Sequence, residues 1–317
     1  MGRQLTTILR RAGFGSTRVA GPRTAEVQGG LASATAARAR SLMPVAAGRR
    51  YDAVLAAADG PDAVAAFERT LAATWSLDAV TEMAGVWAGL SGPVRAAVVD
   101  PVRRLATAGR QTDRTTCGSA VLAMLNAAGD PALALWLATG TVLDVARPTE
   151  LAAAPPDRLA ELADAPVEHR FARLQQVLKR RSNAGGLLGL PWPAAFGTPP
   201  WGAARTARYA GLYFRHEMLD DTDEAHLSGV LVEVAAAVDR GVPVPLYSGG
   251  DTSRGWSTAV PRHLVLVMGR TTDGLTIWEP GSGRIADVPV AVLVAGGVPV
   301  PALGHWHHLT WAVLPEL

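Results

Sequence analysis

The sequence predicts an α+β protein on three observations. Helical patterns fill the chain up to about residue 238, and strand patterns replace them from residue 242 onward. Of the 317 residues, 49% are hydrophobic, which is enough to fill a sizeable core. An Asp273-Gly274 pair between two apolar runs is typical of a hairpin, which joins antiparallel strands. We therefore expect helices first and a largely antiparallel sheet after them.

The first fifty residues are basic and poor in aromatic side chains. They contain nine arginines against the single acid Glu26, and several glycines interrupt any long helix. A nucleic-acid-binding arm would need aromatic side chains between the basic ones, to stack on bases. We therefore interpret residues 1–50 as a solvated, partly ordered lead-in.

Residues 51–110 are helical in pattern. One helix covers residues 51–59 and ends at Gly60, and Pro61 occupies a first-turn position of the next. Two further helical segments lie around 80–90 and 94–105. Together they indicate a small helical region that packs against the rest of the chain.

The only cysteine, Cys117, lies where a polar turn enters an apolar helix over residues 117–127. Thr115 and Thr116 are both suitable N-caps for that helix. A thiol in a first helical turn faces free N–H groups and the positive end of the helix dipole, which favour the nucleophilic thiolate. Gln111, six positions earlier, carries an amide that can reach an oxyanion formed at Cys117. Without further partners, however, a lone cysteine is most often a small buried hydrophobe.

The middle of the chain continues as helices that are separated by one long loop. A second helix follows Pro131 and ends at Gly140, and residues 168–181 form a further amphipathic helix. The segment 182–202 is rich in glycine and proline; it is either irregular cover over the core or a wall of a substrate groove. A short helix over 203–210 and a short strand over 212–214 follow.

Two histidine-containing segments have the composition of metal sites. In the segment 216–226 the acids precede an apolar helix over 227–238, where carboxylates stabilise a helix start. The spacing of its histidines matches no ligand motif. His305, His307 and His308 fall in a final strand over about 305–314, where alternation places His308 on the opposite face. We expect no metal at either segment.

The last third of the chain reads as strands. Residues 242–247 are extended, His263 opens a buried run up to Gly269, and residues 275–278 form the return strand of the hairpin and end at Glu279. His263 and Glu279 therefore stand at adjacent strand ends, where side chains can meet. An imidazole there can take the proton of the Cys117 thiol, while a carboxylate holds its other nitrogen.

In this order, the motifs resemble those of the papain-like cysteine peptidases. The resemblance rests on Gln111-x5-Cys117-Gly-Ser, on His263-Leu-Val-Leu-Val-x-Gly and on Trp278-Glu279-Pro280. The closest type is the bacteriocin-processing peptidases that cut after double-glycine leaders, and their stand-alone relatives. The resemblance covers residues 105–317 and leaves 1–104 as a separate N-terminal lead-in and helical region.

The resemblance implies a fold in which the nucleophile helix packs on an antiparallel sheet. It also implies four catalytic residues. Gln111 supplies the oxyanion hole, Cys117 the nucleophile and His263 the base, and Glu279 orients the imidazole. The family usually has aspartate at that last position, and this chain has glutamate.

Three functions remain open at this level. The first is a cysteine hydrolase, a peptidase acting on a peptide or protein substrate. The second is a transglutaminase-like acyltransferase that uses the same Cys-His-acid site. The third is a non-catalytic binding protein on a papain-like scaffold, which the glutamate at 279 keeps open. The sequence does not indicate an oligomeric state.

Composition argues against several other classes. A formal net charge of +2 gives no general basis for binding nucleic acid or a membrane surface. No apolar run approaches the roughly 20 residues of a membrane span, and no nucleotide-binding Gly-x4-Gly-Lys motif occurs. One cysteine permits no internal disulfide. We expect a soluble cytoplasmic protein that needs no cofactor.

Overall fold

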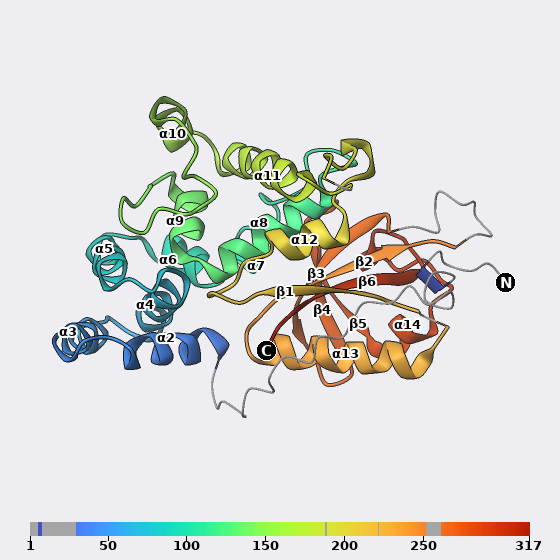
Figure 1. Ribbon diagram of the computed structural model, residues 1–317, viewed down its shortest axis with the longest axis horizontal. Helices are drawn as coiled ribbons and strands as arrows, with labels where there is room; N and C mark the ends of the chain where they lie inside the picture. Colours follow the sequence, from blue (N-terminus) through green and yellow to red (C-terminus); the bar gives the residue numbers. More distant parts are fainter. Residues whose placement is uncertain (1–5, 8–29, 188, 221, 252–260) are drawn as a thin grey trace.

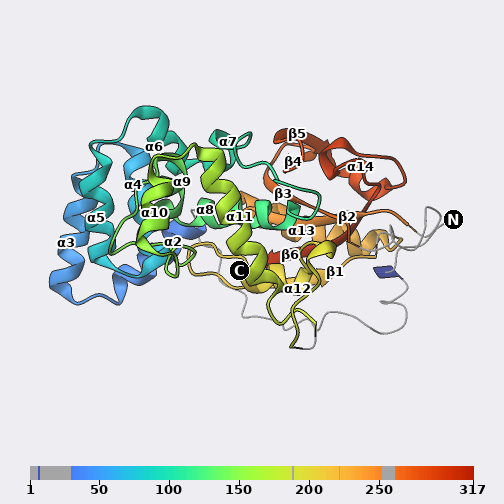
Figure 2. The same cartoon turned by 90° about the horizontal axis from the view of Figure 1, so that it is seen from above.

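The computed structural model describes residues 6–7, 30–187, 189–220, 222–251 and 261–317. Helices dominate the chain up to residue 206, and one six-stranded antiparallel sheet dominates the rest (Figure 1). The α+β prediction is confirmed. Seen from above, helices α3–α6 lie at one end and the strands at the other, with α8 and α11 between them (Figure 2).

The N-terminal helices begin earlier than the sequence analysis expected. The helices of this half are α2 (Leu31–Ser41), α3 (Val45–Ala56), α4 (Pro61–Thr74), α5 (Leu77–Trp87), α6 (Gly92–Val99) and α7 (Pro101–Arg104). The prediction of a solvated, partly ordered lead-in up to residue 50 is wrong for residues 31–41 and 45–50, which are helical. Alanine in α2 favours helix, and Leu31, Ala36 and Ala39 are buried there. Residues 1–5 and 8–29 of the lead-in lie outside the described residues.

The helix predicted over 94–105 is two helices. Pro101 has no N–H to continue the hydrogen bonding of α6, and it takes the first position of α7 instead. The Asp100 side chain accepts a hydrogen bond from the backbone N–H of Arg103, and so caps the new helix. The chain therefore turns at Asp100, just before the segment that leads to Cys117.

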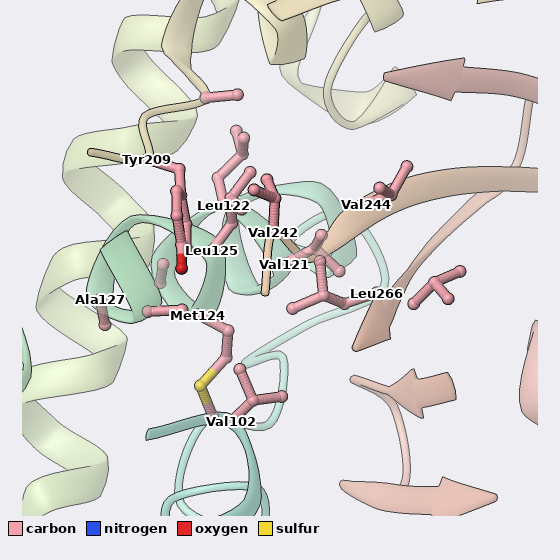
Figure 3. Packing of buried hydrophobic residues seen from close by; sticks show 14 of the residues in the cluster. Val102, Val121, Leu122, Met124, Leu125, Ala127, Tyr209, Val242, Val244 and Leu266 are labelled. Atoms are coloured by element: carbon pink, nitrogen blue, oxygen red, sulfur yellow. The ribbon is translucent and has the colours of Figure 1, made fainter. Parts of the chain in front are cut away.

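Helix α8 (Cys117–Gly129) is the centre of the molecule, since all thirteen of its residues are buried. Figure 3 shows Val121, Leu122 and Leu125 of this helix among side chains from the sheet, from α7 and from connecting segments. Removing such a buried side chain typically costs about 2–5 kcal/mol, because transfer and cavity terms add. This packing fixes α8, and with it the position of Cys117.

Four further helices follow α8 in the chain. They are α9 (Pro131–Thr139), α10 (Pro156–Ala163), α11 (Val167–Asn183) and α12 (Pro200–Thr206). Three of them, α9, α11 and α12, pack against α8. Asp130 caps α9 through its carboxylate, and Gly140 ends it with φ of 81°, a conformation that favours glycine. The predicted helices after Pro131 and over 168–181 are confirmed, whereas the helix predicted over 203–210 is displaced, since α12 starts at Pro200.

The sheet has the strand order β1-β6-β2-β3-β4-β5, with antiparallel pairing between all neighbours. Its strands are β1 (Phe214–Met218), β2 (Val244–Gly249), β3 (His263–Arg270), β4 (Gly274–Glu279), β5 (Arg284–Pro289) and β6 (His308–Pro315). Helix α8 and α12 cover one face, and α13 (Glu224–Asp239) covers the other (Figure 1). The β3–β4 hairpin at Asp273-Gly274 was predicted correctly.

Two predicted strand boundaries in this half are wrong. Strand β1 begins at Phe214, where the predicted strand ended, and so His216 lies within it. After β5 the chain forms a further helix, α14 (Val290–Ala295), although β-branched residues favour strands. Strand β6 starts at His308, and His305 adopts a left-handed φ of 63°, so the predicted alternation of the three histidines does not occur.

Two short 3-10 helices, η1 (Ala194–Phe196) and η3 (Pro301–Leu303), complete the described chain. Within the described residues, no single helix is long and apolar enough to cross a membrane. Helices α8 and α9 reach the required length only as a pair, and the two are bent by 116° relative to each other.

Candidate active site

Cys117 is the first residue of α8, and its thiol is almost fully buried. Thr116 occupies the N-cap position, as predicted, but its hydroxyl does not cap the helix. That hydroxyl accepts hydrogen bonds from the backbone N–H groups of Thr112 and Asp113, both at 3.0 Å. The backbone N–H groups in the first turn of α8 are therefore not used by this cap, and they remain available to the Cys117 sulfur and to a ligand bound next to it.

The turn before Cys117 is tied to α11. Gln175 is completely buried; its side-chain oxygen accepts from the Thr112 N–H at 3.2 Å, and its side-chain nitrogen donates to the Arg110 carbonyl at 2.8 Å. Lys179, one turn further along α11, donates to the hydroxyl of Thr115. These bonds hold the entry to α8 in one conformation.

His263 and Glu279 meet at one edge of the sheet. His263 begins β3 and Glu279 ends β4, and because the two strands are antiparallel, a strand start and a strand end lie side by side. His263 Nε2 and Glu279 Oε1 are 2.7 Å apart, and both side chains are buried. Gly304 lies against the imidazole: a Cβ at that position would be 2.5 Å from His263 Cδ2.

Glu279 is held by more than the histidine. Its Oε1 also accepts the N–H of Gly281 at 2.6 Å, and its Oε2 accepts the N–H of Ser282 at 2.7 Å. Burial alone would raise the pKa of this carboxyl group, but these partners outweigh burial and lower the pKa to about 2. The longer glutamate side chain thus forms the carboxylate–imidazole contact that the sequence analysis assigned to it.

The thiol and the imidazole form the other half of the pair. Because Nε2 faces Glu279, Nδ1 is the nitrogen left for the hydrogen bond between His263 and Cys117. Burial opposes charge on both groups, but each favours the charged form of the other. The pKa of Cys117 is held below its usual value, with help from the Leu264 and Gly118 N–H groups, and that of His263 rises to about 9.

Gln111 lies beside this site, but its amide is engaged elsewhere. Its backbone N–H donates to the carbonyl of Pro280 at 2.9 Å, which joins the turn to the segment after Glu279. Its side-chain nitrogen donates to the carbonyl of Asp113 at 3.1 Å, and its side-chain oxygen is buried without a partner. Gln111 does not line the pocket at Cys117. Of the four predicted residues, His263 and Glu279 are joined by a hydrogen bond, Cys117 lines the same pocket as His263, and Gln111 lies outside that pocket.

A small pocket of about 40 Å³ opens at the sulfur, and we call it the Cys117 pocket. Besides Cys117 and His263, its walls are Arg114, Gly118, Ala195, Phe196, Gly197, Thr198, Tyr247, Pro261 and Arg262. The loop over 182–202 therefore contributes one wall, which was one of the two roles considered for it. Sequence analysis did not identify Arg114, Thr198 or Arg262, because no spacing rule links them to Cys117.

Thr198 is placed against the start of α8. The phenol of Tyr247 donates to the Thr198 carbonyl at 2.9 Å, and the Thr198 hydroxyl is buried without a partner. A Cβ added to Gly118 would be 2.5 Å from both Cβ and Oγ1 of Thr198. Glycine at 118 is therefore required by space rather than by backbone conformation.

Gly118→Ala should displace Thr198 or tilt the first turn of α8, and so move the sulfur relative to His263. We expect the rate of Cys117 alkylation at pH 6 to fall about tenfold or more, since small misplacements of reacting groups are costly. The double variant Gly118→Ala, Thr198→Gly should recover most of the rate. Gly85→Ala is the matched control, because it adds the same methyl group to a helix where nothing lies within 4 Å. Equal rates in wild type and Gly118→Ala would contradict this role.

A larger cavity of about 170 Å³ lies elsewhere, between α9, α10 and α11. Its walls are mostly apolar, and its one acid, Glu150, is already bound by Arg208. Its lining contains no cysteine, serine or threonine that could act as a nucleophile. The smaller Cys117 pocket is therefore the better candidate for a reaction site. Over the ranges that the structure describes, no three histidine, cysteine or acidic side chains come together as a metal site.

Comparison with known proteins finds no matching family model, no matching curated protein and no matching solved structure.

Proposed function

We propose that this chain is a cysteine hydrolase, a peptidase of papain-like arrangement, that cleaves an amide bond through an acyl-enzyme on Cys117. The observation that carries the proposal is the buried chain Cys117–His263–Glu279. It joins a thiol with a lowered pKa to an imidazole that a carboxylate holds at 2.7 Å. A cysteine with no catalytic role needs neither partner.

In the first half of the reaction, the Cys117 thiolate attacks the carbonyl carbon. The S–C bond forms and the carbonyl electron pair moves to oxygen, where the Cys117 backbone N–H can donate. The family resemblance implies Gln111 as the second donor, and its amide would have to turn from the Asp113 carbonyl toward the pocket to act there. Collapse of the intermediate breaks the C–N bond, and the imidazolium of His263 gives its proton to the leaving amine.

In the second half, water replaces the amine. His263, now neutral, takes a proton from the water as its oxygen attacks the thioester carbon. The S–C bond breaks, the carboxylic acid leaves, and thiolate and imidazolium are restored. Glu279 stays ionised throughout, because its pKa is about 2. The reaction consumes one water and needs no cofactor.

The test is digestion of a blocked peptide library, read by mass spectrometry as new peptide termini. We expect cleavage by the wild type and none by Cys117→Ala, with acyl-enzyme of the expected mass when an activated ester is used. An added amine distinguishes hydrolysis from acyl transfer, and we expect the free acid to remain the main product.

The binding-scaffold alternative predicts a different result. A folded wild-type protein that neither cleaves the library nor acylates Cys117 with an activated ester would overturn the proposed function. A product that carries the added amine in place of water would instead favour the acyltransferase.

A further inference from the structure

Two arginines from different parts of the chain line the Cys117 pocket. Arg114 comes from the turn before α8, and Arg262 directly precedes the catalytic histidine. Among the described residues of the wall, and apart from Cys117 and His263, only these two side chains bear charge near neutral pH. The pocket therefore presents two permanent positive charges beside the reactive sulfur.

Neither guanidinium has an acceptor within the described parts of the chain, and both residues are exposed. Other arginines of this protein are engaged: Arg208 holds two buried acids, and Arg170 donates to several carbonyls. Arg262 is fixed only through its backbone N–H, which donates to the Ser248 carbonyl at 2.9 Å. The two guanidinium groups are thus free to bind something that enters the pocket.

Two acids close to the site in sequence or in space, Asp113 and Glu279, are already hydrogen-bonded. The Asp113 carboxylate accepts from the N–H and the hydroxyl of Thr115, both at 2.6 Å. Glu279 is held by His263, Gly281 and Ser282. The neighbouring segment 252–260 contains no acidic residue in its sequence. Within the described residues no carboxylate pairs with Arg114 or Arg262, which leaves both guanidinium groups available to a carboxylate of the substrate.

The shape of the pocket favours the same class of ligand. Gly118, Ala195 and Gly197 leave only a narrow space at the sulfur, which suits a small group at the reacting carbonyl. Guanidinium groups at the rim match the planar, two-oxygen geometry of a carboxylate.

We propose that the Cys117 pocket selects acidic acyl donors, in which a carboxylate side chain flanks the bond that Cys117 attacks. Arg114 and Arg262 are the specificity-determining residues. The natural substrate class is then an acidic peptide segment. This inference rests on the proposed function, since it concerns substrates of the same thiol.

The test compares two alkylating reagents that differ in charge, iodoacetate and iodoacetamide. In both reactions the Cys117 sulfur forms a bond to the CH₂ carbon and iodide leaves, so the ratio of the two rates cancels any change in thiolate reactivity. We expect this ratio, taken relative to that of glutathione, to be raised in the wild type. Arg114→Gln and Arg262→Gln should each lower it roughly two- to fivefold, and salt should lower it further.

Arg49→Gln is the matched control, because Arg49 is an exposed arginine on α3 and lies outside the pocket. An equal fall of the ratio in Arg49→Gln would assign the effect to net charge and overturn the inference. A ratio that is the same in wild type and in the double variant Arg114→Gln, Arg262→Gln would overturn it as well. Failure of the neutral reagent to label Cys117 at pH 6 would instead count against the proposed function, which keeps the two failures distinct.

Discussion

Glu279→Gln should lower the rate of peptide cleavage by about 10⁴-fold, the loss found when the acid of a catalytic triad is removed. An amide at this position can present an N–H₂ group to His263 Nε2, which turns the imidazole or selects the wrong tautomer. Without the carboxylate, the pKa of His263 falls below its value of about 9, and the pKa of Cys117 rises. The pH range in which thiolate and imidazolium coexist should therefore narrow from both sides, as a rate profile between pH 5 and 10 would record.

Glu82→Gln is the control for simple loss of stability. The Glu82 carboxylate accepts the backbone N–H groups of Asp144, Val145 and Ala146 at 2.7–3.0 Å, much as Glu279 accepts two such groups, but it has no histidine partner. We expect Glu82→Gln to leave the pH profile unchanged. If Glu279→Gln retained the wild-type rate and profile, Glu279 would not orient the imidazole.

Arg208→Ala should lower the free energy of unfolding at pH 7 by about 3–5 kcal/mol, because it leaves two buried carboxylates without their cation. Arg208 Nη1 is 2.9 Å from Asp130 Oδ2, and its Nη2 is 2.8 Å from Glu150 Oε2. Both acids are almost fully buried. Burial raises the pKa of Asp130, whereas Arg208 outweighs burial at Glu150 and lowers its pKa. Urea unfolding at pH 7 measures the loss directly.

The loss should shrink as the pH falls. Without Arg208, burial raises the pKa of both acids, so they become neutral more readily as the pH falls and then no longer need a cationic partner. Replacing both with Asn and Gln in the Arg208→Ala background should likewise recover part of the stability at pH 7. Arg40→Ala breaks an exposed ion pair with Asp52 and should change stability far less. Equal losses in the two arginine variants would contradict the structural role of Arg208.

The sequence alone was enough to predict that His263 and Glu279 meet at the candidate site, because their pairing depends on positions that local patterns mark. A cysteine at a helix start, a histidine at a strand start and an acid at the end of the paired strand are each visible along the chain. The Asp273-Gly274 hairpin then determines that His263 and Glu279 share a sheet edge. The α+β class followed from the change in the hydrophobic pattern, which is helical in the first part of the chain and typical of strands in the last part.

Contacts between distant segments left no such signal. Thr198 meets Gly118, Arg114 shares a pocket with Arg262, and Arg208 bridges Asp130 and Glu150, all through tertiary packing. Strand β1 was placed too early, because its Phe-Arg-His-Glu-Met sequence does not alternate cleanly at the sheet edge where it pairs only with β6. The six-residue separation of Gln111 from Cys117 led us to predict that its amide faces the oxyanion. That separation could not reveal that the amide donates to the Asp113 carbonyl instead.

The most direct test of the central claim is the pH dependence of Cys117 alkylation by iodoacetamide, read by intact mass in wild type and in His263→Ala. An isolated thiol has a pKa of about 8.5, whereas a histidine-paired one can fall to roughly 3–4. We predict rapid labelling of the wild type at pH 5–6 that is lost in His263→Ala. Labelling that rises only above about pH 8, alike in both proteins, would contradict a thiolate–imidazolium pair and with it the proposed chemistry.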